Sequence, residues 1–205
     1  MTLYALKPQV QALLRPAARV LHHIGITANQ VTIGTCVVSI ALGAFLAANA
    51  DALAVFCLLP VWCVLRMALN ALDGVLAREF GQSSRLGAIL NEITDPVADA
   101  ALYGAFAFIA NVGAPLVVCV VVLSALTEVA AEFGATRGAR RRNDGPMGKS
   151  DRAFVFGVLG LMLGCGVAPG VWLEWALAAI ALLLVATIAN RVLRGAAAAR
   201  AVPGR

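Results

Sequence analysis

Six apolar stretches, each of about 20 residues or slightly more, alternate with short polar connections along this chain. A helix of that length rises about 1.5 Å per residue and can cross the hydrocarbon core of a bilayer. The composition agrees, because 61% of the 205 residues are hydrophobic and only 13% are charged. We therefore predict an all-α, polytopic membrane protein. The six expected spans are 29–49, 53–78, 84–110, 113–135, 152–168 and 171–193.

The basic residues lie almost entirely in alternate connections. Fifteen of the sixteen Lys and Arg side chains fall in the N-terminal segment, in 78–85, in 136–152 or in the tail from Arg191. The connections 49–51 and 111–115 carry none. Because basic loops are retained on the cytoplasmic side, we expect both termini and the 78–85 turn to face the cytoplasm of a bacterial-type inner membrane.

The chain begins with a segment whose apolar side chains can share one broad face of a helix. Such a helix lies in the membrane surface rather than across the bilayer. We therefore expect residues 1–28 to form an amphipathic interfacial helix, with Thr27 or Asn29 capping the first span. Residues 29–194 then form a six-helix transmembrane catalytic domain, and residues 195–205 form an Ala-rich, disordered cytoplasmic tail.

Polar side chains gather in one stretch, residues 70–99, inside otherwise apolar runs. Asn70 and Asp73 share one face of a helix, and Asn91 and Asp95 share one face of the next. The intervening turn is short, so the two helices should be antiparallel neighbours with these side chains facing each other. Polar clusters are costly in hydrocarbon and mark functional sites. Oxygen donors of this kind suit a hard divalent cation carrying a phosphate.

The spacing of this stretch forms a long motif. It begins Asn-x-x-Asp-Gly-x-x-Ala-Arg, continues with eight residues and Gly, and ends with three residues, Asn, three residues and Asp. It resembles the signature of the CDP-alcohol phosphotransferase (CDP-alcohol phosphatidyltransferase) family, in which both Asn positions are Asp. Asn70 and Asn91 therefore depart from the family pattern. The positions that match in type and spacing are Asp73, Gly74, Ala77, Arg78, Gly87 and Asp95.

The resemblance implies transfer of a phosphoalcohol group, phosphatidyl by expectation, from a CDP-alcohol to an acceptor alcohol with release of CMP, in phospholipid biosynthesis. It implies Mg²⁺ or Mn²⁺ as cofactor, CDP-diacylglycerol as lipid donor, a polar acceptor alcohol, membrane lipid around the protein, and a homodimer. Nucleic acid is not an expected partner. Asp95 would be the catalytic base, and the metal ligands would be Asn70, Asp73, Asn91 and Asp95. The nucleotide would be bordered by Gly74, Ala77, Arg78 and Gly87.

The two asparagines change the charge of the site. Four aspartates would carry −4, whereas Asp73 and Asp95 carry −2. A carboxamide can ligate a cation through its carbonyl oxygen but bridges two cations poorly, so we expect one metal, or two held weakly. Glu92 either restores part of the charge or supports the site indirectly. An active variant, an unusual substrate and a degenerate site all remain open, as does a non-enzymatic lipid-binding protein or small carrier.

Two further segments are similar to the family. Residues 27–32 resemble the Thr-Pro-Asn-x-x-Thr start of its first span, with Ala in place of Pro. Residues 145–152 resemble the start of its fifth span, where a Gly- and Pro-containing turn presents Lys149 and Arg152. These two side chains either form a phosphate-binding rim or anchor the loop at anionic lipid.

Arg66 is the one basic residue in the middle of an apolar stretch. It precedes Asn70 by four residues and shares its helix face. The next span runs in the opposite direction, which should bring Asp99 to a similar depth. Because an unpaired charge there is costly, we predict an intramembrane Arg66–Asp99 ion pair that supports the site from below.

Overall fold

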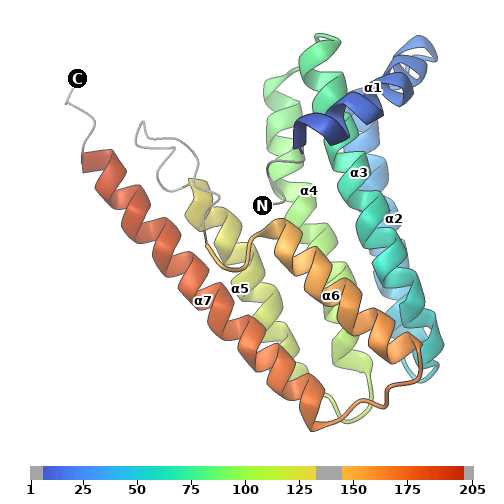
Figure 1. The fold of residues 1–205 in the computed structure, drawn as a ribbon, viewed down its shortest axis with the longest axis vertical. Helices are drawn as coiled ribbons and strands as arrows, with labels where there is room; N and C mark the ends of the chain where they lie inside the picture. The colour runs from blue at the N-terminus through green and yellow to red at the C-terminus, as the bar shows by residue number, and fades with distance from the viewer. Residues whose placement is uncertain (1–6, 133–144, 201–205) are drawn as a thin grey trace.

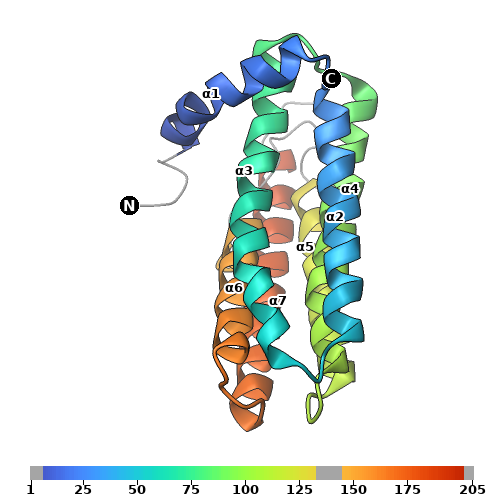
Figure 2. The same ribbon diagram turned by 90° about the vertical axis from the view of Figure 1, so that its right-hand side faces the viewer.

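The computed structural model describes residues 7–132 and 145–200, and every regular element within these ranges is helical (Figure 1). Helix α1 lies across one end of a bundle formed by the other helices (Figure 2). The elements in chain order are α1 (Lys7–His23), α2 (Ala28–Ala48), η2 (Leu53–Cys57), α3 (Leu58–Glu79), α4 (Arg85–Gly104), η3 (Ala105–Phe108), α5 (Ala114–Glu132), α6 (Lys149–Gly164) and α7 (Val171–Arg200).

Side-chain caps set the starts of α2 and of α4, the second of which carries predicted site residues. Thr27 Oγ1 accepts from the Gln30 backbone N–H at 3.3 Å, while the Thr27 N–H donates to Gln30 Oε1 at 2.8 Å. This capping box makes Thr27, rather than Asn29, the cap of α2. At α4, Ser84 Oγ accepts from the Gly87 N–H at 2.9 Å. The short turn before Ser84 joins α3 and α4 in antiparallel order, as the sequence predicted, but both helices pack on α2 and meet each other through long side chains, such as Asn70 with Asp95.

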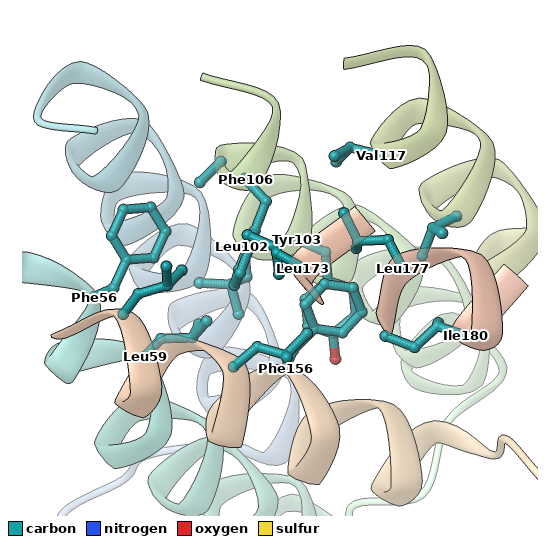
Figure 3. Packing of buried hydrophobic residues seen from close by; sticks show 14 of the residues in the cluster. Phe56, Leu59, Leu102, Tyr103, Phe106, Val117, Phe156, Leu173, Leu177 and Ile180 are labelled. Atoms are coloured by element: carbon teal, nitrogen blue, oxygen red, sulfur yellow. The ribbon is translucent and has the colours of Figure 1, made fainter. Parts of the chain in front are cut away.

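The bundle is held together by pairwise helix contacts, chiefly α2 with α4, α5 with α7, and α3 with α6, and α1 packs on α3. Its core contains a cluster of aromatic rings (Figure 3). Tyr103 stacks on Phe156 with ring centroids 3.9 Å apart, and Phe106 meets the edge of Phe156 at 5.3 Å. Offset and edge-on ring contacts of this kind stabilise packed helices beyond the area that they bury. They join α4 and η3 to α6.

The outside of the bundle is apolar, and its mainly apolar interior also holds buried polar and charged side chains. Large hydrophobic side chains such as Val61, Val64 and Leu182 are about 70% exposed. By contrast, Arg66 and Asp99 are 3% and 2% exposed. An exposed apolar surface of this extent marks contact with lipid or another apolar partner. This distribution, together with the long apolar helices, identifies a membrane protein.

In the part of the chain that the structure describes, four helical stretches are long and apolar enough to cross a membrane: Ala28–Ala48, Leu53–Glu79, Ala114–Glu132 and Val171–Ala198. They correspond to four of the six spans expected from the sequence. The other two expected spans contain α4, which carries Glu92, Asp95 and Asp99, and α6, which has 16 residues. Both run alongside the apolar helices rather than across the end of the bundle (Figures 1 and 2).

Some boundaries differ from the expected ones. Helix α7 continues to Arg200, so residues 195–200 of the expected disordered tail are helical. Its Ala-rich sequence explains the difference, because alanine has the highest helix propensity. Residues 1–6 of the expected interfacial helix, the basic loop residues 136–144 and residues 201–205 of the tail lie outside the described residues.

Candidate active site

A cavity of about 340 Å³ opens where the start of α2, the end of α3 and the start of α4 meet. These ends gather where α1 crosses the bundle (Figure 2). Seven of the ten site residues predicted from the sequence line it: Asn70, Asp73, Gly74, Ala77, Arg78, Gly87 and Asn91. Asp95, Lys149 and Arg152 do not line it.

The Asp73 carboxylate lies on the α3 wall of the cavity and is 8% exposed. Its Oδ2 accepts a hydrogen bond from Thr32 Oγ1 at 2.8 Å. Thr32 belongs to α2 and also lines the cavity. This contact joins α2 to α3 and fixes the orientation of the carboxylate, with a charge-assisted bond stronger than a neutral one.

Two glycines give the cavity its space. A Cβ atom at Gly87 would lie 2.6 Å from Asn29 Oδ1, and one at Gly74 would lie 2.8 Å from Arg78 Nη2. Both distances are shorter than the non-bonded contacts that Cβ atoms make in proteins. Glycine at these two positions therefore lets Asn29 and Arg78 lie against the hairpin, with Arg78 still exposed to solvent.

The cavity is also lined by Asn29, Thr32 and Gln82, none of which was predicted as a site residue. The first two belong to the segment that resembles the start of the family's first span. Their spacing of three residues puts both on one face of α2, and that face could have pointed to them. Gln82 accepts from the Ala28 N–H at 2.7 Å and fastens the turn to α2. No sequence signal marked this last contact.

Asp95 lies next to the cavity, one hydrogen bond away from its wall. Asn70 Nδ2 donates to Asp95 Oδ1 at 3.2 Å. Arg66 Nη2 donates to the Asp95 backbone carbonyl at 3.0 Å and lies 3.5 Å from Oδ1. The other carboxylate oxygen, Oδ2, forms an ion pair with the Lys149 ammonium. Both oxygens of Asp95 are therefore occupied by groups of the protein itself.

The predicted Arg66–Asp99 ion pair is confirmed. Arg66 Nη1 lies 2.5 Å from Asp99 Oδ1, and both side chains are buried. The second oxygen of Asp99 accepts from Arg152 Nε at 3.2 Å and from Arg152 Nη2 at 3.0 Å. Charges buried in this way are tolerated because each is paired and hydrogen-bonded.

Arg152 lies inside the bundle, neither at a phosphate-binding rim nor at anionic lipid, the two alternatives that the sequence left open for it. Its side chain is 1% exposed. Besides Asp99, its guanidinium donates to Thr127 Oγ1 at 2.8 Å and to Glu128 Oε1 at 2.9 Å, both on α5. The sequence placed Arg152 in a loop, whereas the structure starts α6 at Lys149 and turns Arg152 toward the core. Arg152 therefore joins α4, α5 and α6.

Lys149 is held at the first position of α6 by a turn that α7 supports. The Met147 N–H donates to Thr187 Oγ1 at 3.0 Å, and the Gly148 N–H donates to Asp151 Oδ2 at 2.9 Å. Gly145 has φ +137°, a conformation that residues with a side chain rarely adopt. The Lys149 side chain is 34% exposed, so its ammonium reaches both Asp95 and the surrounding solvent.

The oxygen donors of the cavity fit a divalent cation. Among the described residues, no three His, Cys, Asp or Glu side chains gather closely enough to hold a metal. The cavity instead presents the Asp73 carboxylate with the carboxamides of Asn70 and Asn91. These are hard oxygen ligands of the kind that Mg²⁺ and Mn²⁺ accept. Because Asn70 turns its amide nitrogen to Asp95, its carbonyl oxygen is left to serve as a ligand.

Known proteins are similar to this chain in sequence and in fold. The chain is 43% identical over 175 residues, 85% of each protein, to the inner membrane protein YnbA of Escherichia coli strain K12. Its fold matches phosphatidylinositol phosphate synthase PgsA1 of Mycobacterium tuberculosis in complex with manganese and citrate, with a TM-score of 0.73, 24% identity, and 93% of this chain and 90% of that chain covered. The same synthase with CDP-DAG bound matches with a TM-score of 0.68 and 24% identity over 94% and 96% of the two chains.

A family model for CDP-alcohol phosphatidyltransferases matches residues 25–193, which include the cavity, its lining and the buried ion pairs beneath it. The match covers far more than half of the chain. This protein therefore belongs to the CDP-alcohol phosphatidyltransferase family.

Proposed function

We propose that this protein transfers a phosphatidyl group from a CDP-diacylglycerol-type lipid to a polar acceptor alcohol and releases CMP, as a step of phospholipid biosynthesis. The observation that carries the proposal is the cavity at the α2–α3–α4 junction. It brings a buried carboxylate, Asp73, together with the amides of Asn70 and Asn91 and the exposed guanidinium of Arg78. A diphosphate with its cation needs oxygen ligands on one side and a positive group on the other.

Each residue has a role in this proposal. Asp73, oriented by Thr32, would hold Mg²⁺ or Mn²⁺ together with the carbonyl oxygens of Asn70 and Asn91. The bound cation would neutralise charge on the diphosphate. Arg78 would bind a phosphate of the nucleotide. The small residues Gly74, Ala77 and Gly87, which line the same cavity, would leave room for it.

The acceptor would approach from the side of α6. Asp95 lies there, held by Asn70 and Arg66, and would take the proton of the acceptor hydroxyl. Lys149, whose side chain is about one-third exposed, would attract an acceptor that carries a phosphate. Arg152 would support this side by holding α4 and α6 together rather than by touching substrate.

The acyl chains of the donor would lie in an apolar hollow on α2 and α3, the helices that also line the polar cavity. This hollow, of about 430 Å³, lies between α1, α2 and α3 and is lined by Val31, Val38 and Leu69 among others. A structure of a similar fold has CDP-DAG bound. Acyl chains in this hollow and a nucleotide in the polar cavity would place both parts of the donor on the same pair of helices, α2 and α3.

We also propose the membrane arrangement that the sequence predicted. Helices α2–α7 would cross an inner membrane six times, with α1 in its surface and with both termini and the cavity on the cytoplasmic side. Two copies would form a homodimer. The cavity would then be open to water-soluble CMP and to acceptor alcohols while its donor stays in the bilayer.

The proposal is tested with purified protein, CDP-diacylglycerol, Mg²⁺ or Mn²⁺ and a panel of acceptor alcohols, by measuring CMP release. We expect release that depends on cation and acceptor and is lost in Asp73→Asn. If wild type releases no CMP while an Asn70→Asp, Asn91→Asp double variant does, the chain is a catalytically degenerate relative. If neither releases CMP with any acceptor, the transferase assignment is wrong.

A further inference from the structure

Asp95 has the Lys149 ammonium where a carboxylate of a two-cation site would have a metal. We infer that this site takes a single divalent cation, at Asp73, and that Lys149 is the countercharge of Asp95 in the resting protein, in place of a second cation. The inference rests on the proposed function only in taking a divalent cation as the cofactor.

The first observation is the separation of the two carboxylates. Asp73 lines the cavity with Asn70 and Asn91, whereas Asp95 does not line it. Asn70 stands between them and donates its amide nitrogen to Asp95 at 3.2 Å. An amide nitrogen is a donor and cannot ligate a cation. The side of Asn70 that faces Asp95 is therefore closed to metal, while its carbonyl side is open to the cavity.

The second observation is that the protein already neutralises Asp95. Its Oδ2 pairs with Lys149, and its Oδ1 lies within 3.5 Å of Arg66. Asp99, the nearest buried carboxylate below, is in turn paired with Arg66 and Arg152. A second divalent cation beside Asp95 would have to displace a positive side chain or lie against it, and like charges at such distances repel strongly.

The third observation is the charge of the motif. Two of its four acidic positions are Asn in this chain, so the site carries −2 before Lys149 is counted. Two divalent cations bring +4, and the lysine adds +1. One cation at Asp73 with one ammonium at Asp95 leaves a far smaller imbalance to be met by substrate phosphates. Asn91, by lacking a negative charge, and Lys149, by adding a positive one, both reduce the number of cations that the site can hold.

The arrangement has a consequence for the reaction. Lys149 has one-third of its side chain exposed and is attached to a helix start rather than to the hairpin that holds the cation. When an acceptor phosphate draws the ammonium away, Asp95 regains a free carboxylate oxygen beside the incoming hydroxyl. Lys149 would then couple acceptor binding to the availability of the base.

The test counts cations in the absence of substrate. Mn²⁺ is titrated into the purified protein in detergent, and bound Mn²⁺ is measured by the loss of the free-ion EPR signal. We expect one Mn²⁺ per chain in wild type. Asp73→Asn should weaken binding by about tenfold or more, because it removes the charged ligand, whereas Asp95→Asn should still bind one Mn²⁺ per chain, with an affinity lowered only through its hydrogen bond to the ligand Asn70.

Variants of Lys149 sharpen the test. Lys149→Met leaves Asp95 without its ammonium and should reveal a second, weaker Mn²⁺ site, while Lys149→Arg should keep one. Arg15→Met is the matched control, because it removes the same charge from an exposed pair with Glu79 and should also keep one. Two sites in wild type, no site in wild type, or a single site in Lys149→Met would overturn the inference.

The outcome separates this inference from the proposed transferase activity. One Mn²⁺ per chain without CMP release leaves the charge substitution standing and rejects the activity. CMP release with two Mn²⁺ bound per wild-type chain does the reverse.

Discussion

Arg66 of α3 and Asp99 of α4 meet inside the bundle, with Nη1 and Oδ1 2.5 Å apart and side chains that are 4% and 3% exposed. The other oxygen of Asp99 is held by Arg152 of α6. One carboxylate therefore pairs with two buried guanidinium groups from two helices. Arg66 also reaches up to the backbone of Asp95, so this pair fixes the depth at which the site sits on α4.

Replacing Asp99 should destabilise the protein strongly. Asp99→Asn keeps the size of the side chain but removes the carboxylate that Arg66 and Arg152 share. Among the described residues, this leaves Arg66 only its 3.5 Å contact with the carboxylate of Asp95, and Arg152 only that of Glu128. Breaking a buried pair in this way costs about 3–5 kcal/mol. Thermal unfolding in detergent should show a markedly lower midpoint and less folded protein after purification.

The exposed pair of Arg15 and Glu79, 2.9 Å apart, is the control for this effect. Arg15→Gln should change stability by about 1 kcal/mol or less, because solvent screens the pair. Equal midpoints for Asp99→Asn and wild type would show that the two arginines find other partners and that Asp99 does not hold the helices together.

Removing the Thr32 hydroxyl should impair the site without unfolding the chain. Thr32→Val leaves Asp73 Oδ2 without its 2.8 Å donor, so the carboxylate loses its fixed orientation. We expect CMP release to fall by about tenfold and Mn²⁺ binding to weaken, since a partner of a metal ligand is worth about 10- to 100-fold.

Thr35→Val provides a matched comparison on the same helix. Among the described residues, the Thr35 hydroxyl bonds the Val31 carbonyl of its own helix alone, at 2.8 Å. Thr35 borders the apolar hollow, where the methyl groups of valine fit, so we expect little change in CMP release. Similar losses in the two variants would mean that any valine at this end of α2 disturbs the helix, and that the Thr32–Asp73 contact is not special.

A methyl group at Gly87 should close part of the cavity. Gly87→Ala places Cβ 2.6 Å from Asn29 Oδ1 and 3.0 Å from Ser84 Oγ, the α4 cap. Asn29 must then move away from the hairpin, and we expect a raised KM for the CDP-lipid and reduced turnover. Gly104→Ala, on the same helix with nothing within 4 Å of its Cβ, should be neutral or slightly stabilising. Unchanged kinetics in Gly87→Ala would show that Asn29 is not required.

The hairpin and its ion pair could be predicted because helical spacing alone determines them. Asn70 and Asp73, or Asn91 and Asp95, share a face wherever their helix lies, and a short turn brings the two helices together. The depth argument for Arg66 and Asp99 needed only antiparallel helices of equal rise. The structure confirms the Arg66–Asp99 pair, but it places Asp95 outside the cavity that Asp73 lines, bonded to Asn70.

The position of Arg152 and the contacts from α2 depend on how separate helices pack. Helical spacing within one segment does not predict such contacts. A rim was one of the two alternatives for Arg152 because the preceding turn contains Gly and Pro, yet one more helical turn rotates it into the core against Asp99. Thr32 and Gln82 contribute through contacts 41 and 54 residues away in the chain. Such pairings follow from the tertiary fold.

Tyr103 carries a polar atom that the described part of the chain leaves unpaired. Its hydroxyl is buried and has no hydrogen-bond partner there, while its ring stacks on Phe156 at 3.9 Å. Tyr103→Phe keeps the stacked ring and removes an unsatisfied hydroxyl, a group that costs about 1–3 kcal/mol when buried alone. We therefore expect an unfolding midpoint equal to or above that of wild type. Tyr103→Leu, which removes the ring as well, should lower it. A midpoint several degrees lower in Tyr103→Phe would show instead that the hydroxyl bonds an internal water beside Asp99.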